Sequence, residues 1–285
     1  DQELEDNMRR LVSEMTRSGI TTFESKSGYG LTTKDETRAL AIGSKFTPET
    51  TFLGAHVVPR EYAHRPDAYV SLIIDDMIDA VLPHAKWIDV FCDEGAFDVD
   101  QSRAILQAGK AKGLQPRIHA HQLGRNGGVQ LAVDLDCASA DHCTHLDDSD
   151  IDALAGSQTV ATLVPGAEFS TRAQYPDARR LFDAGVSVAI ATDCNPGSSF
   201  TTSMPFCISV AIRDMHFSPE QALWASTMGG AKALRRDDIG HLAIGAVADL
   251  TILNAPSYLH LGYRPGVDIV SRVIKAGNIT YERVA

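Results

Sequence analysis

The chain has 285 residues, 44% of them hydrophobic, which suffices for one large core or two unequal ones. Its formal net charge of -11 argues against a nucleic-acid partner. The sequence offers no apolar run long enough for a membrane span and no secretory signal, and its five cysteines form no C-x-x-C pair, so we expect a reduced, cytoplasmic chain with no membrane partner.

Apolar residues at helical spacing predict a first helix over 4–15, which Gly19 ends. A short strand is expected over 20–23. Thr33 and Glu36 predict a capping box for a helix that reaches about residue 45. Strands and helices then alternate. The expected strands cover 50–55, 87–91, 116–120, 137–141, 159–164 and 186–191, and the expected helices cover 69–81, 102–112, 127–135, 149–155 and 177–184.

This alternation predicts an α/β fold with a parallel sheet. Seven βα repeats favour a (β/α)8 TIM-type barrel whose first βα unit is missing from this chain. An open doubly wound sheet is the alternative, but the glycine-rich phosphate loop typical of that fold is not found. Two more helices are expected over 203–215 and 219–234, and short strands over 245–253 and 270–276. The predicted domains are therefore a barrel over 1–239 and a small β-rich segment over 240–285.

Polar residues lie at or just after the ends of several predicted strands, and the active sites of such barrels lie at the carboxyl ends of their strands. A single histidine there is usually structural, and an aspartate usually opens a turn or caps a helix. Several together favour a metal centre, because imidazole and carboxylate suit zinc or iron, and a bound ion generates hydroxide near neutral pH. Asp193 would carry the proton to the leaving group. The residues are Tyr29, His56, Glu94, His119, His142 and Asp193.

His119 and His121 form an H-x-H pair on a predicted strand. Residues two apart on a strand face the same way, so the pair could chelate one ion. The alternative places His121 at a pocket rim or in solvent.

Five segments of the chain form a recognisable set: ESKSGYGL at 24–31, GAH at 54–56, IHA at 118–120, SADH at 139–142 and TDCNPGS at 192–198. Together they resemble the imidazolonepropionase family of the amidohydrolase superfamily. The tail GAVADL at 245–250 is similar to the closing segment of that superfamily.

The resemblance implies hydrolysis of the cyclic amide of 4-imidazolone-5-propanoate to N-formimidoyl-L-glutamate, a step of histidine degradation. It implies one divalent or trivalent metal ion, zinc or iron, and a homodimer. The implied metal ligands are His119 and Asp193. The implied catalytic residues are Asp193, His142, which would polarise the carbonyl, and Gln122. The implied substrate-binding residues are Tyr29, His56, Gln122, Asn195, Gly197 and Ser198.

Two departures from the family pattern stand out. His121 occupies a position that is usually acidic, and an H-x-H pair of the first strand, with a substrate-binding arginine beyond it, has no counterpart. We therefore expect a chain that lacks the N-terminal part of such an enzyme and by itself binds metal weakly. The alternatives are another amidohydrolase, such as a heterocycle deaminase or cyclic amidase, and a catalytically incompetent fragment.

Overall fold

A computed structural model describes residues 1–284 of the chain. Its contacts divide the chain into two compact units. Unit 1 consists of Asp1–Glu5 and Phe23–Ala161, and unit 2 consists of Asp6–Thr22 and Thr162–Ala285. Helix α1 (Gln2–Arg17) contributes its first turn to unit 1 and the rest to unit 2.

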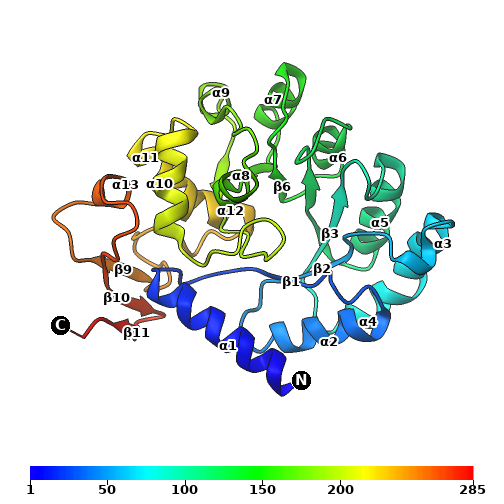
Figure 1. Ribbon diagram of the computed structural model, residues 1–285, viewed down its shortest axis with the longest axis horizontal. Coiled ribbons are helices and arrows are strands. Elements are labelled where there is room, and N and C mark those ends of the chain that lie inside the picture. The colour runs from blue at the N-terminus through cyan, green and yellow to red at the C-terminus, as the bar shows by residue number, and fades with distance from the viewer. Residues whose placement is uncertain (285) are drawn as a thin grey trace. The chain divides into compact units, whose positions relative to one another are not determined.

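Unit 1 is built on a parallel sheet whose strands pair in chain order, with a helix after each main strand (Figure 1). The ends of strands that follow one another in this order therefore lie side by side. The strands are β1 (Ser25–Lys26), β2 (Thr50–Ala55), β3 (Trp87–Cys92), β5 (Ile118–Ala120) and β6 (Ser139–His142), and β4 (Gln115–Pro116) also pairs with β3. The helices are α2 (Thr33–Gly43), a 3-10 turn (Arg60–Tyr62), α3 (Pro66–Leu72), a π turn (Ile73–Met77), α4 (Ile78–Val81), α5 (Val99–Ala111), α6 (Gly128–Asp134) and α7 (Asp148–Ala155).

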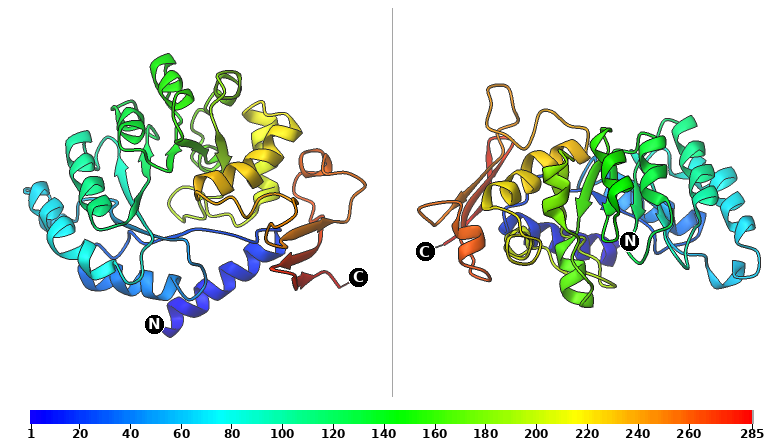
Figure 2. Two further views of the ribbon diagram at one scale, coloured as in Figure 1. Left: turned by 180° about the vertical axis from the view of Figure 1, so that it is seen from behind. Right: turned by 90° about the horizontal axis from the view of Figure 1, so that it is seen from above.

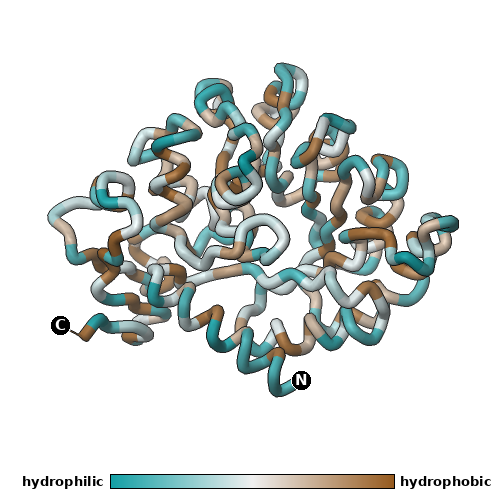
Figure 3. The backbone as a smooth tube through the Cα atoms, viewed as in Figure 1, coloured by the Kyte–Doolittle hydropathy of each residue, from teal (hydrophilic) through white to brown (hydrophobic). Residues whose placement is uncertain are grey.

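The strands of unit 1 are buried almost throughout, as expected for parallel strands covered by helices. Phe52, Trp87, Ile88 and Ile118 have no exposed surface. Figure 3 shows hydrophobic residues concentrated along these strands, with hydrophilic residues on the helical side away from them. Charged residues inside these apolar strands therefore need partners within the protein.

Unit 2 holds the end of β7 (Val160–Leu163) and β8 (Val188–Ile190), and the amide of Ala191 donates to the Leu163 carbonyl. An antiparallel sheet ends the chain, in the order β11-β10-β9, with the C-terminus beyond β11 (Figure 2). Its strands are β9 (Leu250–Leu253), β10 (Val270–Lys275) and β11 (Asn278–Glu282). The helices of unit 2 are α8 (Pro165–Thr171), α9 (Ala178–Asp183), α10 (Met204–Asp214), α11 (Pro219–Trp224), a π turn (Ala225–Gly229), α12 (Gly230–Ala233) and α13 (His260–Tyr263).

The alternation of strands and helices predicted from the sequence is confirmed, and two local predictions are wrong. Residues 20–23, all described, form no strand, and pairing with β2 begins only at Ser25, whose amide donates to the Glu49 carbonyl. The capping box from Thr33 to Glu36 does not form, because the N-cap of α2 is Thr32, which accepts from the Asp35 amide.

The division into domains over 1–239 and 240–285 stays a prediction. Among residues 1–284, every helix falls short of the length and apolar content that crossing a bilayer requires.

Gly229 is a position where the fold allows no side chain. It is buried beside β8, and a Cβ there would lie 2.2 Å from the Val188 carbonyl oxygen. We expect Gly229→Ala to lower the free energy of unfolding by about 1–3 kcal/mol, because strand backbone cannot move aside. The neighbouring Gly230 is the matched control, since a Cβ there meets no described heavy atom within 4 Å. Gly230→Ala should be neutral or stabilising. Equal urea midpoints for the two variants would contradict this account.

Candidate active site

Four of the predicted site residues lie together in unit 1. His56 directly follows β2, His142 is the last residue of β6, and His119 is the middle residue of β5. The Tyr29 ring lies 4.9 Å from that of His56, and the His119 ring 5.3 Å from that of His142. The Phe91 ring connects the two pairs, at 5.9 Å from both His56 and His119. The parallel strands thus bring side chains that are distant in sequence into one row of rings.

Tyr29 lies in the loop after β1 and is 70% exposed. The buried Glu36 carboxylate holds this loop from α2, accepting the amides of Gly30 and Leu31 at 2.8 Å each. Gly30 permits this contact, because a Cβ at this position would lie 2.8 Å from the Asp35 backbone. Glu36 therefore positions the loop that carries Tyr29, a role that the sequence analysis missed by assigning Glu36 to a capping box.

His56 is positioned by the same loop. Its Nδ1 lies 3.0 Å from the Gly28 carbonyl oxygen, and since a carbonyl only accepts, Nδ1 carries a proton. Burial lowers the pKa of His56 and outweighs the opposing effect of the Gly28 carbonyl. The neutral ring thus has Nε2 as an acceptor, which suits contact with a ligand donor.

His119 is held by a carboxylate that the sequence analysis did not single out. Its Nδ1 lies 3.1 Å from Asp89 Oδ1 and 3.0 Å from Asp89 Oδ2. Burial would lower the pKa of His119, but the Asp89 charge and the hydrogen bond to Asp89 together outweigh it and raise that pKa. Because Nδ1–H donates to Asp89, the neutral ring has its lone pair on Nε2, the form in which histidine binds a metal ion. His119 therefore fits the metal-ligand role.

A half-buried ammonium group holds Asp89 in turn. Lys26 Nζ lies 2.7 Å from Asp89 Oδ2, 2.9 Å from Glu24 Oε1 and 3.4 Å from Asp141 Oδ2. Arg117 pairs with the other oxygen of Glu24 at 2.9 Å. Charged residues inside otherwise apolar strands were the available sequence signal for this network, because such residues are rarely buried without partners.

The charges of the network shift one another's pKa values. Burial would raise the pKa of Asp89 and of Asp141, but their charged neighbours hold the pKa of Asp89 well below its usual range and lower the pKa of Asp141. For Lys26, burial would lower the pKa, and the carboxylates outweigh it and raise it. All three groups are therefore charged at neutral pH.

Asp89, His119 and Asp141 each offer a ligand atom within 4.8 Å of the others. Asp141 Oδ1 is buried and has no hydrogen-bond partner among residues 1–284. However, the Lys26 ammonium contacts both carboxylates, so a cation already lies against them.

The turn after β5 corrects the prediction for His121. β5 ends at Ala120, and His121 has a φ of 57°, which takes it out of the strand, so it does not share a face with His119. It lies neither at a pocket rim nor in solvent, since it is 1% exposed and its Nδ1 is 3.5 Å from Asp150 Oδ2.

Gln122, the residue after His121, is held through its backbone. Its amide donates to Asp93 Oδ2 at 2.7 Å. Buried Asp93 thus positions the Gln122 backbone.

The remaining predicted residues lie in one turn of unit 2. Asp193 follows β8 with a φ of 63°, and its Oδ2 accepts from Ser198 Oγ at 2.5 Å. The Gly197 amide donates to Asn195 Oδ1 at 2.7 Å. The structure therefore gathers Asp193, Asn195, Gly197 and Ser198 in a compact turn, as the sequence predicts.

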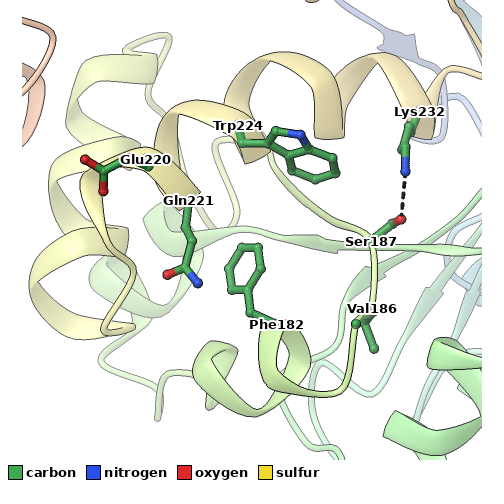
Figure 4. A pocket seen from close by; sticks show the side chains of 8 residues that line it. Phe182, Val186, Ser187, Glu220, Gln221, Trp224 and Lys232 are labelled. Carbon is green, nitrogen blue, oxygen red and sulfur yellow. Dashed lines mark hydrogen bonds between the residues drawn. The ribbon is translucent and has the colours of Figure 1, made fainter.

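Unit 2 also has a pocket of about 470 Å³ near the amino end of β8, lined partly by Phe182, Ser187, Trp224 and Lys232 (Figure 4). Lys232 Nζ donates to Ser187 Oγ at 3.3 Å. Since parallel barrels carry their chemistry at the carboxyl ends of the strands, where Asp193 lies, this pocket is not the candidate active site.

Comparison with known proteins identifies the class of protein. The Amidohydrolase family matches residues 1–280, and the chain belongs to this family. The chain is 64% identical over 282 residues to an imidazolonepropionase of Mycolicibacterium smegmatis, covering 99% of this chain and 71% of that protein. It is 65% identical over 277 residues to an imidazolonepropionase of Streptomyces avermitilis, covering 97% of this chain and 67% of that one.

Solved structures with 13–19% identity share the fold. An adenosine deaminase from Xanthomonas campestris with bound zinc matches with a TM-score of 0.74, covering 98% of this chain and 70% of that one. An atrazine chlorohydrolase mutant from Arthrobacter aurescens, complexed with zinc and atraton, matches at 0.76, covering 98% and 72%. A guanine deaminase from C. acetobutylicum matches at 0.75, covering 98% and 76%. The fold is thus the amidohydrolase (β/α)8 barrel type with a small antiparallel sheet, and not an open doubly wound sheet.

The role of Glu36 predicts a local change when it is replaced. Glu36→Ala removes the acceptor of the Gly30 and Leu31 amides, so we expect these two amides to exchange hydrogen at least tenfold faster. Glu36→Gln keeps one oxygen acceptor and should change the rates less. NMR-detected hydrogen exchange measures both, with the exposed Asp35→Ala as the matched control on the same helix turn. Unchanged exchange in Glu36→Ala would show that the loop is held by other contacts.

Proposed function

We infer that the chain is a metal-dependent hydrolase that opens the cyclic amide ring of 4-imidazolone-5-propanoate to N-formimidoyl-L-glutamate, in histidine degradation. The identity of 64% to the imidazolonepropionase of Mycolicibacterium smegmatis, over 99% of this chain, carries this conclusion. In the reaction, the oxygen of water bonds to the ring carbonyl carbon, the C–N bond breaks, and the ring nitrogen receives a proton.

We propose that the cofactor is one metal ion, zinc or iron, and that His119 Nε2 and a carboxylate oxygen of Asp193 are ligands. The Nδ1–H of His119 bound to Asp89 supports this, because it leaves Nε2 available. Zinc in two solved relatives of the fold supports a divalent ion. A bound ion supplies Lewis acidity and lowers the pKa of water.

We assign proton transfer to Asp193 and carbonyl polarisation to His142. One oxygen of Asp193 takes the proton of the attacking water and delivers it to the leaving ring nitrogen. His142 donates a hydrogen bond to the carbonyl oxygen as negative charge develops there. The short bond from Ser198 to Asp193 holds the carboxylate in one orientation.

We assign substrate recognition to two groups of residues. Tyr29, His56 and Gln122 contact the imidazolone ring, where the phenol, the neutral imidazole and the amide offer both donors and acceptors. Asn195, Gly197 and Ser198 hold the propionate, which would replace Asn195 Oδ1 and Asp193 Oδ2 as the acceptor of the Gly197 amide and the Ser198 hydroxyl. These local donors are needed because the net charge of -11 gives an anionic substrate no long-range attraction.

We further propose that the enzyme is a cytoplasmic homodimer with no nucleic-acid or membrane partner. The acidic net charge supports the absence of a nucleic-acid partner.

A substrate comparison tests the proposed function. Purified protein is supplied with zinc or iron(II), and ring opening of 4-imidazolone-5-propanoate is followed against ammonia release from guanine and adenosine. We expect ring opening and no ammonia release, at a low rate because the chain by itself is expected to bind metal weakly. Ammonia release without ring opening would instead identify a heterocycle deaminase. Neither activity, together with no bound metal by elemental analysis, would identify a catalytically incompetent fragment.

Replacement of Asp193 tests its assignment. Asp193→Asn keeps the size of the side chain but removes its charge and basicity, so we expect kcat to fall about 10²–10⁴-fold with a much smaller change in KM. Metal content is measured on the same sample, because loss of the ion would add to the effect. Asp183→Asn, at an exposed position of α9, is the matched control and should leave kcat unchanged. Normal turnover by metal-loaded Asp193→Asn would refute the assignment.

A further inference from the structure

We propose that Asp89 is a positioning residue that fixes the ring of His119 as a metal ligand, and that Lys26 in turn fixes Asp89. The inference rests on the proposed role of His119 as a ligand. It goes beyond that role because it assigns a task to buried Asp89 and half-buried Lys26, neither of which would touch the substrate or the ion.

The contact between Asp89 and His119 is built into the sheet. β3 and β5 are neighbouring parallel strands, and Phe91 is the strand partner of His119. Asp89 lies two residues before Phe91 and so faces the same side of the sheet. Both Asp89 oxygens lie within 3.1 Å of His119 Nδ1, and Asp89 is 1% exposed. A carboxylate only accepts, so the contact selects the His119 tautomer with its proton on Nδ1.

Lys26 prevents Asp89 from turning away. Its ammonium, 2.7 Å from Asp89 Oδ2, also contacts Glu24 and Asp141, and these contacts fix its own position. Asp89 therefore serves two donors at once, the Lys26 ammonium and the His119 Nδ1–H. Because a carboxylate has two acceptor oxygens, the two donors do not have to compete for one acceptor.

The charge of the network favours a cation on the far side of the His119 ring. Three carboxylates face two cationic side chains, which leaves one net negative charge beside the His119 ring. Such a charge increases the basicity of Nε2 and attracts a metal ion. The three carboxylates are Glu24, Asp89 and Asp141, and the two cations are Lys26 and Arg117.

The other arrangement that these contacts allow is an ion bound directly by Asp89, His119 and Asp141. It would place a divalent cation against the Lys26 ammonium, which contacts both Asp89 and Asp141. The repulsion between these two cations disfavours this arrangement. The two arrangements differ in whether Asp141 binds the ion, so replacing Asp141 separates them.

Zinc affinity of the full protein chain, measured by competition with a chromophoric chelator, tests the proposal. We expect Asp89→Asn to weaken affinity about 10–100-fold, because its single oxygen cannot serve both Lys26 and His119, and its NH2 group would favour the wrong tautomer. Asp141→Asn is the matched control: it removes the same charge beside Lys26 but no contact to His119 Nδ1, and should change affinity less than about threefold. The visible spectrum of bound Co²⁺ should change in Asp89→Asn and not in Asp141→Asn.

A measurement on the unaltered protein removes any dependence on folding of the variants. Nitrogen-15 NMR of histidine-labelled, metal-free chain reports which nitrogen of His119 carries the proton, with His119→Asn used to assign the signal. We expect the Nδ1–H tautomer at a pH where the ring is neutral. The Nε2–H tautomer would overturn the proposal.

The outcomes also separate this proposal from the proposed function. If His119→Asn keeps full zinc affinity, His119 is not a ligand and the metal assignment fails. If His119→Asn loses affinity while Asp89→Asn and Asp141→Asn behave alike, the metal assignment stands and the positioning role of Asp89 is refuted. Equal and large losses in the last two variants would instead indicate direct binding by both carboxylates.

Discussion

The enclosure of one half-buried ammonium group among three carboxylates is the constraint on which unit 1 depends. Lys26 on β1 contacts Asp89 on β3 and Asp141 on β6, so a single charge connects strands far apart in the sheet. Burying these groups is costly, and their mutual attraction offsets that cost only while every partner is present. Removal of one partner from such a network generally destabilises a protein by about 3–5 kcal/mol. The same network fixes the His119 ring, so stability and site geometry share one origin.

The two units hold different kinds of candidate site residues. Unit 1 supplies rings at strand ends, held by buried carboxylates such as Asp89 and Glu36. Unit 2 supplies a tight turn, in which the Asp193 carboxylate and small polar groups lie close together. Rigid strands carry the imidazoles, while loops carry Tyr29 and the turn residues. Loops on a shared barrel are where related enzymes change their substrates, which fits a fold shared with deaminases and a chlorohydrolase.

Predictions from the sequence succeeded where a local pattern decides the structure and failed where a partner distant in sequence decides it. Strand ends placed His56 and His142 correctly, because apolar runs and their stops mark strands. The segment 20–23 has strand-forming residues, but the ladder with β2 begins only at Ser25. His121 was misplaced because a single positive φ after Ala120 changes the direction of its side chain.

The sequence by itself determined the order of elements, the class of fold and the strand-end residues of the site, because periodicity, turn residues and motifs are local properties of the chain. The tertiary structure alone decided which charges meet. Lys26, Asp89 and Asp141 are up to 115 positions apart and carry no common motif, so only the register of parallel strands brings them together. It also decided the tautomer of His119, because a ring nitrogen carries its proton according to the partner it faces.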